Sequence, residues 1–259
     1  MDPDSPLDAG TGQSNPRDYP GGALHPAYLP GNGFTAGVEL LVRIPMASSR
    51  NINPTLVQEN LGRCGLEISE PVLRQVCLYL GLLEKWNQYL NLTGHRSQTA
   101  ILENLFAESF LGARYLESND SPCLDVGAGA GFPGMPMKML RPELEMVLLE
   151  PRQKRSNFLS VVKRELGLTQ VEILTCRLED VVPGNFRLSP TVYVSRGLGN
   201  QAKLLAAAKG LWPGLRKIQL FTTPDLSQSL VAELKNIHWN VPLVVPWNHH
   251  HVLLRGEWV

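Results

Sequence analysis

The sequence lacks the features that mark membrane proteins, secreted proteins and disulfide-rich domains. No apolar run approaches the about 20 residues that a helix needs to cross a bilayer. The chain does not begin with a basic segment followed by an apolar stretch, and its four cysteines form no C-x-x-C pair. We therefore expect a cytoplasmic protein with no membrane partner, whose thiols lie buried in a reducing compartment.

An excess of either charge is also absent, because 24 Lys and Arg balance 24 Asp and Glu. The distribution is nevertheless uneven, since residues 141–259 carry 15 basic against 10 acidic side chains. Arg152, Lys154 and Arg155 begin a predicted helix in this part, and a basic helix face can bind RNA phosphates. A merely solvated charged surface is the alternative, and the charge pattern does not separate the two.

The apolar pattern divides the chain into three regions. Residues 1–50 are rich in Gly, Pro, Asp and Ser, which predicts a disordered leader, with Met46 as an alternative start. Residues 51–118 place apolar side chains at three- and four-residue steps, which predicts an N-terminal helical module or helices packed on a sheet. Residues 119–259 alternate short apolar runs with helical stretches, which predicts one α/β domain.

This third region predicts a mostly parallel, seven-stranded sheet with helices on both faces. The expected strands are Pro122–Val126, Glu145–Glu150, Val171–Cys176, Thr191–Ser195, Ile218–Thr222, Val241–Val245 and Val252–Arg255. The expected helices are Phe132–Leu140, Arg152–Leu166, Asn200–Leu211 and Leu226–Asn236. The last two strands flank a polar turn and predict an antiparallel pair. In the helical region, Ser69 followed by a proline predicts a capped helix start.

The segment from Cys123 to Pro136 joins a buried strand, a glycine loop and a helix start without a spacer. Gly127, Gly129 and Gly131 allow positive φ and let backbone N–H groups approach a ligand. Asp125 stands at the strand end and faces the same crevice. Because ligands of open parallel sheets lie beyond the carboxyl ends of the strands, this segment predicts a nucleotide-type cofactor pocket.

Residues at the ends of the following strands complete this expected pocket. Glu150 lies about 19 residues after Gly131, where a carboxylate can accept both ribose hydroxyls. Leu178 can flank an adenine, and Glu179 can bond its edge. Arg196 follows the fourth strand.

Two cofactor classes fit this arrangement. Three alternating glycines after an acidic strand end are typical of S-adenosylmethionine sites, whereas Gly129-x-Gly131-x-x-Gly134 has the spacing of an NAD site. The NAD match is weaker, because Pro133 falls inside the turn that must present amides to a pyrophosphate. A purely structural turn remains the third explanation.

The motif Asp125-Val-Gly-Ala-Gly-Ala-Gly-Phe-Pro-Gly-Met-Pro136 carries a resemblance to a known family. Together with Lys154-Arg155 and Ser195-Arg196, it resembles the small-subunit ribosomal RNA guanine-N7 methyltransferases, also called glucose-inhibited division protein B. The resemblance covers about residues 55–200. It implies a Rossmann-like, S-adenosylmethionine-dependent methyltransferase fold and, as partner, ribosomal RNA or the small ribosomal subunit. Independently of the resemblance, we favour a monomer.

The resemblance also implies roles for individual residues. It assigns the cofactor site to Gly127, Phe132, Glu150, Leu178, Glu179 and Arg196. Two segments depart from the family's pattern: residues 104–110, where Glu108 replaces an aspartate and an Arg and a His are lost, and residues 221–225, where a Lys-Gly turn is missing. These departures leave open a non-catalytic RNA-binding protein of the same fold.

Guanine N7 is a lone-pair nucleophile, so methyl transfer to it requires alignment rather than a strong base. Arg196 is the candidate catalytic residue, because its guanidinium can hold a carboxylate of the cofactor or donate to guanine O6. The alternative is an ion pair with Asp125 or Glu108. If Arg196 is catalytic, Arg196→Ala is expected to abolish transfer and to leave the fold intact.

The run His249-His250-His251 does not predict a metal site. Consecutive strand residues point to opposite faces, and no cysteine or carboxylate is close in sequence. We interpret the run as a polar turn entering the last strand, and we expect no metal. An NAD-linked oxidoreductase remains the rival enzyme class, although no Tyr-x-x-x-Lys pair or catalytic histidine stands at a strand end.

Overall fold

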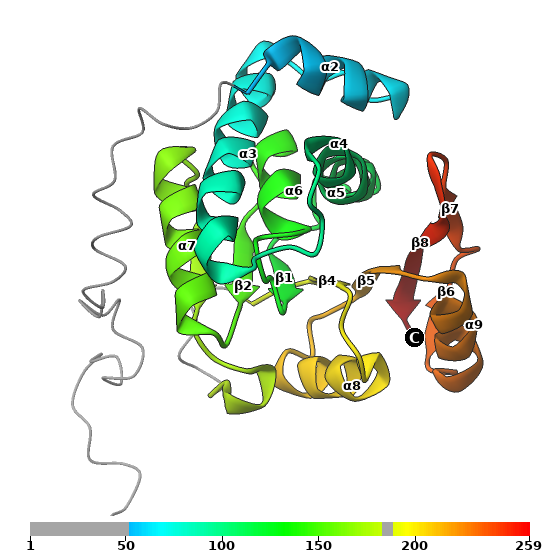
Figure 1. The fold of residues 1–259 in the computed structure, drawn as a ribbon. Coiled ribbons are helices and arrows are strands. Elements are labelled where there is room, and N and C mark those ends of the chain that lie inside the picture. The colour runs from blue at the N-terminus through cyan, green and yellow to red at the C-terminus, as the bar shows by residue number, and fades with distance from the viewer. Residues whose placement is uncertain (1–51, 183–188) are drawn as a thin grey trace, which may run out of the picture. The chain divides into compact units, whose positions relative to one another are not determined.

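A computed structural model describes residues 52–182 and 189–259 of the chain (Figure 1). The predicted leader lies outside these residues. Within the two described stretches, no helix is both long and apolar enough to cross a membrane. All four cysteines are free; Cys64 and Cys123 are buried, whereas Cys77 and Cys176 are only partly buried.

The first described part is helical. Helix α2 (Pro54–Arg63) precedes the long helix α3 (Glu70–Leu90), which ends where Asn91 adopts a left-handed conformation. Ser69 occupies the N-cap of α3, but its side chain makes no capping hydrogen bond, so the predicted capping interaction is wrong. A continuous helical stretch follows, formed by α4 (Gln98–Ile101), the π-helical turn η3 (Leu102–Ala107) and α5 (Glu108–Ala113).

The rest of the chain forms one mixed sheet in the order β3-β2-β1-β4-β5-β8-β6, with β7 paired to β8. The parallel strands are β1 (Cys123–Val126), β2 (Met146–Leu149), β3 (Val171–Leu174), β4 (Val192–Arg196) and β5 (Lys217–Thr222). The antiparallel strands are β6 (Ile237–Trp239), β7 (Leu243–Val245) and β8 (Asn248–Trp258). The strand order reverses between β1 and β4, which is where such sheets bind their ligands.

Two apolar cores, one on each face of the sheet, hold the helices in place. Alternate strand residues such as Cys123 and Val194 pack with α2, α3, α5, α6 (Gly134–Leu140) and α7 (Gln153–Glu165). Their neighbours Leu124 and Tyr193 pack with α8 (Gln201–Leu211), α9 (Pro224–Glu233) and the 3-10 turn η4 (Leu178–Asp180). In Figure 1, α3, α6 and α7 lie together on one side of β1 and β2, and α8 lies on the other. The Rossmann-like α/β fold with a mostly parallel sheet is thus confirmed.

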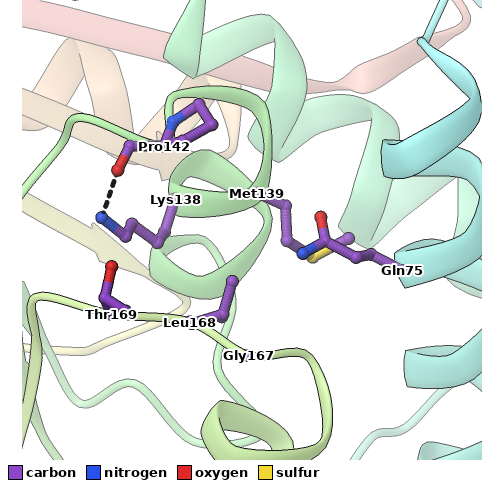
Figure 2. Close-up of a pocket in the computed structure, with 7 residues that line it drawn as sticks. All are labelled: Gln75, Lys138, Met139, Pro142, Gly167, Leu168 and Thr169. Carbon is purple, nitrogen blue, oxygen red and sulfur yellow. Dashed lines mark hydrogen bonds between the residues drawn. The ribbon is translucent and has the colours of Figure 1, made fainter.

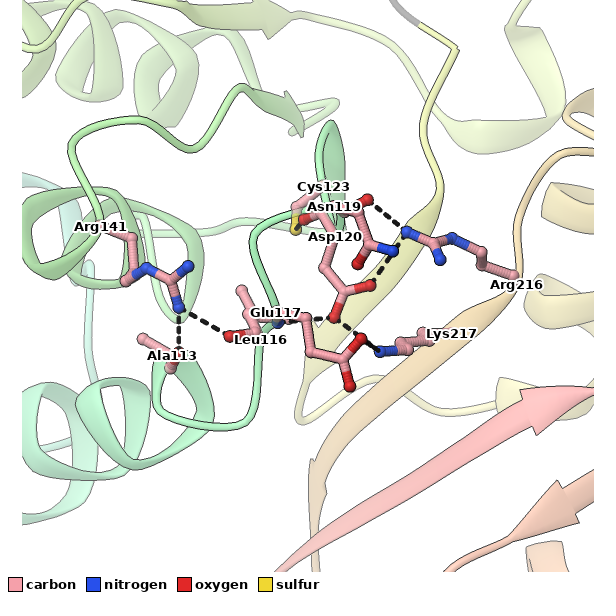
Figure 3. Close-up of polar contacts among 9 residues, drawn as sticks. All are labelled: Ala113, Leu116, Glu117, Asn119, Asp120, Cys123, Arg141, Arg216 and Lys217. Carbon is pink, nitrogen blue, oxygen red and sulfur yellow. Dashed lines mark hydrogen bonds and ion pairs between the residues drawn. The ribbon is translucent and has the colours of Figure 1, made fainter.

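A buried carboxylate ties the amino ends of the strands together (Figure 3). Asp120 is 0% exposed and accepts from Arg216 at 3.1 Å and from Lys217 at 2.9 Å, at the start of β5. The backbone N–H of Glu117 donates to the same carboxylate at 2.8 Å. Burial lowers the pKa of Lys217, but its bonds to Asp120 and Glu117 outweigh burial and raise it. These bonds anchor the turn before β1 to β5, opposite the glycine loop.

The structure differs from the predicted elements mainly at the C-terminus. Within the described residues the sheet contains eight strands rather than seven, because the short strand β6 was not predicted. Its three residues are too few for their alternation to predict a strand, and the pairing with β8 makes them one. Strand β8 begins four residues earlier than predicted and includes the histidine run. The predicted antiparallel pair of the last two strands is confirmed.

Candidate active site

The glycine loop follows β1 at the carboxyl edge of the sheet, as predicted. Gly127, Gly129 and Gly131 have φ values of 71°, 58° and 91°, a region that disfavours side chains with a Cβ. A Cβ on Gly127 would lie 2.8 Å from the Leu198 side chain. At Gly129 the nearest atom would be the Arg155 Nη1, at 3.8 Å, so the space above Gly129 is open. The centre of the loop therefore leaves room for a ligand to approach the backbone closely.

Gly131 faces inward, against an aromatic cluster. A Cβ at this position would overlap the Tyr79 hydroxyl, which donates to the carbonyl of Ala130. The Phe132 ring stacks on Tyr79, with ring centroids 5.3 Å apart, and meets Phe106 edge-on at 5.1 Å. Phe132 is 5% exposed. The structure therefore places Phe132 in the core beneath the loop rather than on its open side.

The hydrogen-bond donors of the loop are largely used within the protein. Gly129 N–H donates to Glu150 Oε2 at 2.9 Å, and Gly131 N–H donates to the Ala128 carbonyl at 2.7 Å. Glu150 Oε1 also accepts from the N–H of Arg152 at 2.9 Å, so this buried carboxylate joins the loop to the start of α7. The predicted row of amides facing a ligand is thus not present at these positions. Instead, the Glu150 carboxylate lies against the backbone of the loop.

Asp125 closes the N-terminus of α6. Its Oδ2 accepts from Gly134 N–H at 2.9 Å, while its Oδ1 is buried without a hydrogen-bond partner among the described residues. Burial raises the pKa of Asp125 from 3.8 to about 7, although the Gly134 bond and the Arg196 charge lower it. A buried acceptor with no donor is the kind of group that a cationic ligand satisfies.

This carboxyl group predicts a pH dependence of stability. The folded protein holds the Asp125 proton more tightly than the unfolded chain, so its contribution to the free energy of unfolding is lost as pH rises from 3.8 to about 7. The loss is on the order of 4 kcal/mol. Asp125→Asn should flatten this decline, which urea unfolding at pH 5 and pH 8 measures. The control Asp225→Asn removes an exposed carboxylate and should retain the wild-type decline in stability. An equal decline in Asp125→Asn and Asp225→Asn would contradict the assignment of the decline to Asp125.

The two residues predicted to bind the adenine differ in exposure. Leu178 is 2% exposed and belongs to the core that packs with α8, whereas Glu179 is exposed. Of the predicted RNA-binding residues, Arg152 and Lys154 are exposed at the start of α7. Arg155 is partly buried, with Nη1 beside the loop at Gly129. The three basic residues therefore do not share one outward face.

Arg196, at the end of β4, forms a buried ion pair. Its Nη2 lies 2.9 Å from Oε2 of Glu108, and its guanidinium lies 4.7 Å from the centroid of the Phe221 ring. The other oxygen, Oε1, lies 2.7 Å from Nδ1 of His251. The Glu108 side chain is 1% exposed. The pairing with Glu108 is one of the two alternatives that the sequence left open, and Asp125 is not the partner.

Two further residues, His95 and Asn248, lie close to the groups of this ion pair. His95, in the segment after α3, is partly buried; burial and then the Arg196 charge lower its pKa. Asn248 donates from Nδ2 to Oδ1 of Asn104 at 2.9 Å and contacts His251 Nδ1 at 3.2 Å. The bonds Asn104–Asn248 and Glu108–His251 join residues 144 and 143 positions apart, so the sequence did not predict them. No local pattern signals such a pairing.

A separate cavity lies between α3, α6 and the turn after α7 (Figure 2). It has a volume of about 100 Å³ and is lined by Gln75, Lys138, Met139, Pro142, Gly167, Leu168 and Thr169. Burial lowers the pKa of Lys138, whose ammonium donates to the carbonyls of Pro142 and Leu144. None of the predicted site residues lines this cavity. Its lysine connects the end of α6 to the segment before β2.

The residues at the carboxyl edge fit S-adenosylmethionine better than NAD. A pyrophosphate needs free N–H groups at the loop and at the helix start, but Glu150 and Asp125 already accept from Gly129 and Gly134 there. S-adenosylmethionine is a cation that carries an adenosyl group and no phosphate. The site offers it the carboxylates of Glu150 and Asp125, of which Asp125 Oδ1 has no hydrogen-bond partner among the described residues, and open space above Gly129. The two occupied amides therefore favour a cationic or neutral ligand over one that carries phosphates.

Comparison with known proteins agrees with this chemistry. The family model described as rRNA small subunit methyltransferase G, or GidB, matches residues 72–218. Proteins named ribosomal RNA small subunit methyltransferase G are similar to this chain. That from Chromobacterium violaceum is 33% identical over 61% of this chain and 79% of its own length. That from Fusobacterium nucleatum is 32% identical over 57% and 63%, and that from Lactococcus lactis subsp. cremoris (strain SK11) is 39% identical over 44% and 49%.

The matched residues include the glycine loop, Glu150 and Arg196, but they end before the β7–β8 hairpin. The chain spans 63% of the Fusobacterium relative and about half of the Lactococcus relative. Because the family model covers more than half of the chain, including every predicted cofactor residue, the chain belongs to the GidB family of rRNA small subunit methyltransferase G proteins.

Proposed function

We propose that the protein transfers a methyl group from S-adenosylmethionine to guanine N7 in small-subunit ribosomal RNA. One observation carries this proposal: carboxylates accept from the N–H of Gly129 in the loop and from the N–H of Gly134 at the α6 start, which leaves an acidic cradle suited to a cation without phosphates. Family membership and the names of the relatives support the RNA substrate. The cytoplasm, where ribosomal subunits and free thiols occur together, is the proposed location.

The residues of the chain would divide the work of binding as follows. The open position at Gly129 would admit the nucleoside, and Glu150, whose two oxygens each accept one N–H, keeps lone pairs for the ribose hydroxyls. Asp125 Oδ1 would accept from the ammonium group. When bound, the cofactor supplies a methyl group on a sulfonium, and guanine N7 needs no proton removed before it accepts that group. The contribution of the protein would be alignment and charge stabilisation.

Arg196 would stand at the target end of this site. It is the last residue of β4, the neighbour of β1 across the reversal of strand order, so its side chain and the glycine loop flank the same edge. With Nη2 paired to Glu108 and Nε buried, the Nη1 group would donate to a guanine O6 or to a carboxylate of the cofactor.

We assign RNA phosphate contacts to Arg152 and Lys154, which are exposed at the start of α7 next to the loop. The double variant Arg152→Ala/Lys154→Ala should bind RNA more weakly and reduce the slope of log K against log salt by about 1 to 2, because each phosphate contact releases counterions. Filter binding of an rRNA fragment at several salt concentrations measures this slope. Arg164→Ala is the matched control, since Arg164 lies on the same helix but pairs with Glu165 at 2.6 Å. Equal slopes in both variants would remove the assignment.

The proposed function is tested by ligand binding and by mapping of methylated nucleotides. Calorimetry should show binding of S-adenosylmethionine and none of NAD. Ribosomal RNA from cells without the gene should lack one N7-methylguanine that returns when the wild-type gene is restored. Cofactor binding without any missing methyl group would favour another methyl acceptor. RNA binding without cofactor binding would favour the non-catalytic RNA-binding alternative.

A further inference from the structure

The C-terminal hairpin β7–β8 reaches the candidate active site from outside the residues that the family model matches. It contacts the helical stretch η3–α5 through three hydrogen bonds. Trp247 Nε1 donates to the Glu103 carbonyl at 3.0 Å, Asn248 bonds Asn104 at 2.9 Å, and His251 bonds Glu108 at 2.7 Å. The three partners lie within six residues of one another, on a π-helical turn and the residue after it. The hairpin is thus docked on the element that carries Glu108.

The bond between His251 and Glu108 requires a proton between the two atoms. Nδ1 and Oε1 are 2.7 Å apart, and two lone pairs would repel each other at that distance. An Nδ1–H group donating to a carboxylate satisfies both atoms and is charge-assisted. Since Oε2 is engaged by Arg196, each oxygen of this buried carboxylate has its own donor.

Glu108 therefore connects the hairpin to the guanidinium of Arg196. Arg196 Nε is buried and has no hydrogen-bond partner among the described residues, and Phe221 supports the guanidinium only through its ring face. The orientation of the guanidinium thus depends on one directional ion pair. If Oε1 lost its donor, the carboxylate could rotate, and the direction of the Arg196 N–H groups would change with it.

We propose that His251 is a positioning residue: it holds Glu108, which in turn orients Arg196 toward the methyl acceptor. The proposal rests on the proposed function, because it gives Arg196 a role at the target. It also adds to the site a residue of the C-terminal hairpin that the sequence had assigned to a polar turn. His251 acts through Glu108 and needs no contact with substrate or cofactor.

Kinetics of His251 variants test the proposal. His251→Ala should lower kcat by about 10- to 100-fold, the usual cost of misplacing a catalytic group, and leave the Kd for S-adenosylmethionine within twofold. His251→Asn should restore kcat to within about threefold, because the amide Nδ2 can donate from the position of Nδ1. His249→Ala, at an exposed neighbouring histidine, is the matched control and should behave as wild type. A folded His251→Ala protein with wild-type kcat would overturn the proposal.

A measurement on the protein without cofactor separates this proposal from the proposed function. Nitrogen-15 NMR of histidine side chains should show a protonated Nδ1 at His251 in the wild type, and Glu108→Ala should remove that signature. An unprotonated Nδ1 in the wild type would overturn the proposal even if His251→Ala failed to fold. Absence of methyl transfer by the wild-type protein, with the Nδ1–H group present, would contradict the proposed function instead.

Discussion

Arg196→Ala should abolish methyl transfer and also destabilise the fold. The loss of turnover, expected to be at least about 100-fold, follows from removing an oriented donor at the target end of the site. The loss of stability follows from leaving the Glu108 carboxylate, 1% exposed, with His251 as its remaining side-chain partner. Removing one partner of a buried ion pair costs about 3 to 5 kcal/mol, and the His251 contact should keep the loss near the lower value.

Glu108→Gln/Arg196→Ala is the variant that separates these two effects. A neutral amide in place of the Glu108 carboxylate no longer requires a cation, so the double variant should recover most of the free energy of unfolding without recovering transfer. Urea unfolding and incorporation of labelled methyl groups into rRNA measure the two quantities. A stable Arg196→Ala protein with near-normal turnover would remove Arg196 from the site. The sequence alone predicted an intact fold for Arg196→Ala, and the ion pair with Glu108 is the reason to revise that expectation.

Among Gly→Ala substitutions in the loop, Gly131→Ala should cause the largest loss of stability. With φ at 91°, a Cβ would overlap the Tyr79 hydroxyl and lie 2.8 Å from Met135. Tyr79 cannot retreat freely, because it is 0% exposed, donates to Ala130 and stacks on Phe132. Backbone strain and overpacking together should cost about 2 to 6 kcal/mol. Cofactor binding should weaken in parallel, since the loop rests on this contact.

Gly129→Ala is the matched control for Gly131→Ala. Gly129 also has positive φ, at 58°, but its Cβ would lie 3.8 Å from the nearest atom. It should cost only about 1 to 2 kcal/mol in stability. Its methyl group would instead enter the space assigned to the nucleoside and weaken cofactor binding. Thermal unfolding and calorimetry on both variants distinguish the effects. Equal stability of the two variants would contradict the close packing at Gly131.

Local patterns predicted most of the α/β core because strands β1 to β4 are short, mostly apolar runs between turns. Strands β1 and β2 are buried on both faces, so their residues stand out from the flanking turns without any knowledge of their partners. The helices α6 to α9 begin within two residues of the predicted positions, since prolines and polar residues mark their starts. Strand β6 was not predicted because three residues carry too little pattern, and it forms a strand by pairing with β8.

The candidate site was predictable to the extent that it lies at strand ends. Gly127, Gly129, Glu150 and Arg196 do meet at one edge, because the carboxyl ends of neighbouring parallel strands must do so. Spacing could not predict which way a side chain points. Phe132 turns into the aromatic cluster, and the loop amides of Gly129 and Gly131 donate to the Glu150 carboxylate and the Ala128 carbonyl rather than to a ligand.

By itself the sequence determined the fold class, the order of its elements and the place of the glycine loop, because these depend on residue types close together in the chain. Only the tertiary structure decided that Glu108 is the partner of Arg196 and that His251 holds Glu108 from the far side. These groups are 88 and 143 residues apart, and no local periodicity encodes such distances. Their contact arises from burial, which forces a carboxylate without access to water to find its donors wherever the packed helices and strands place them.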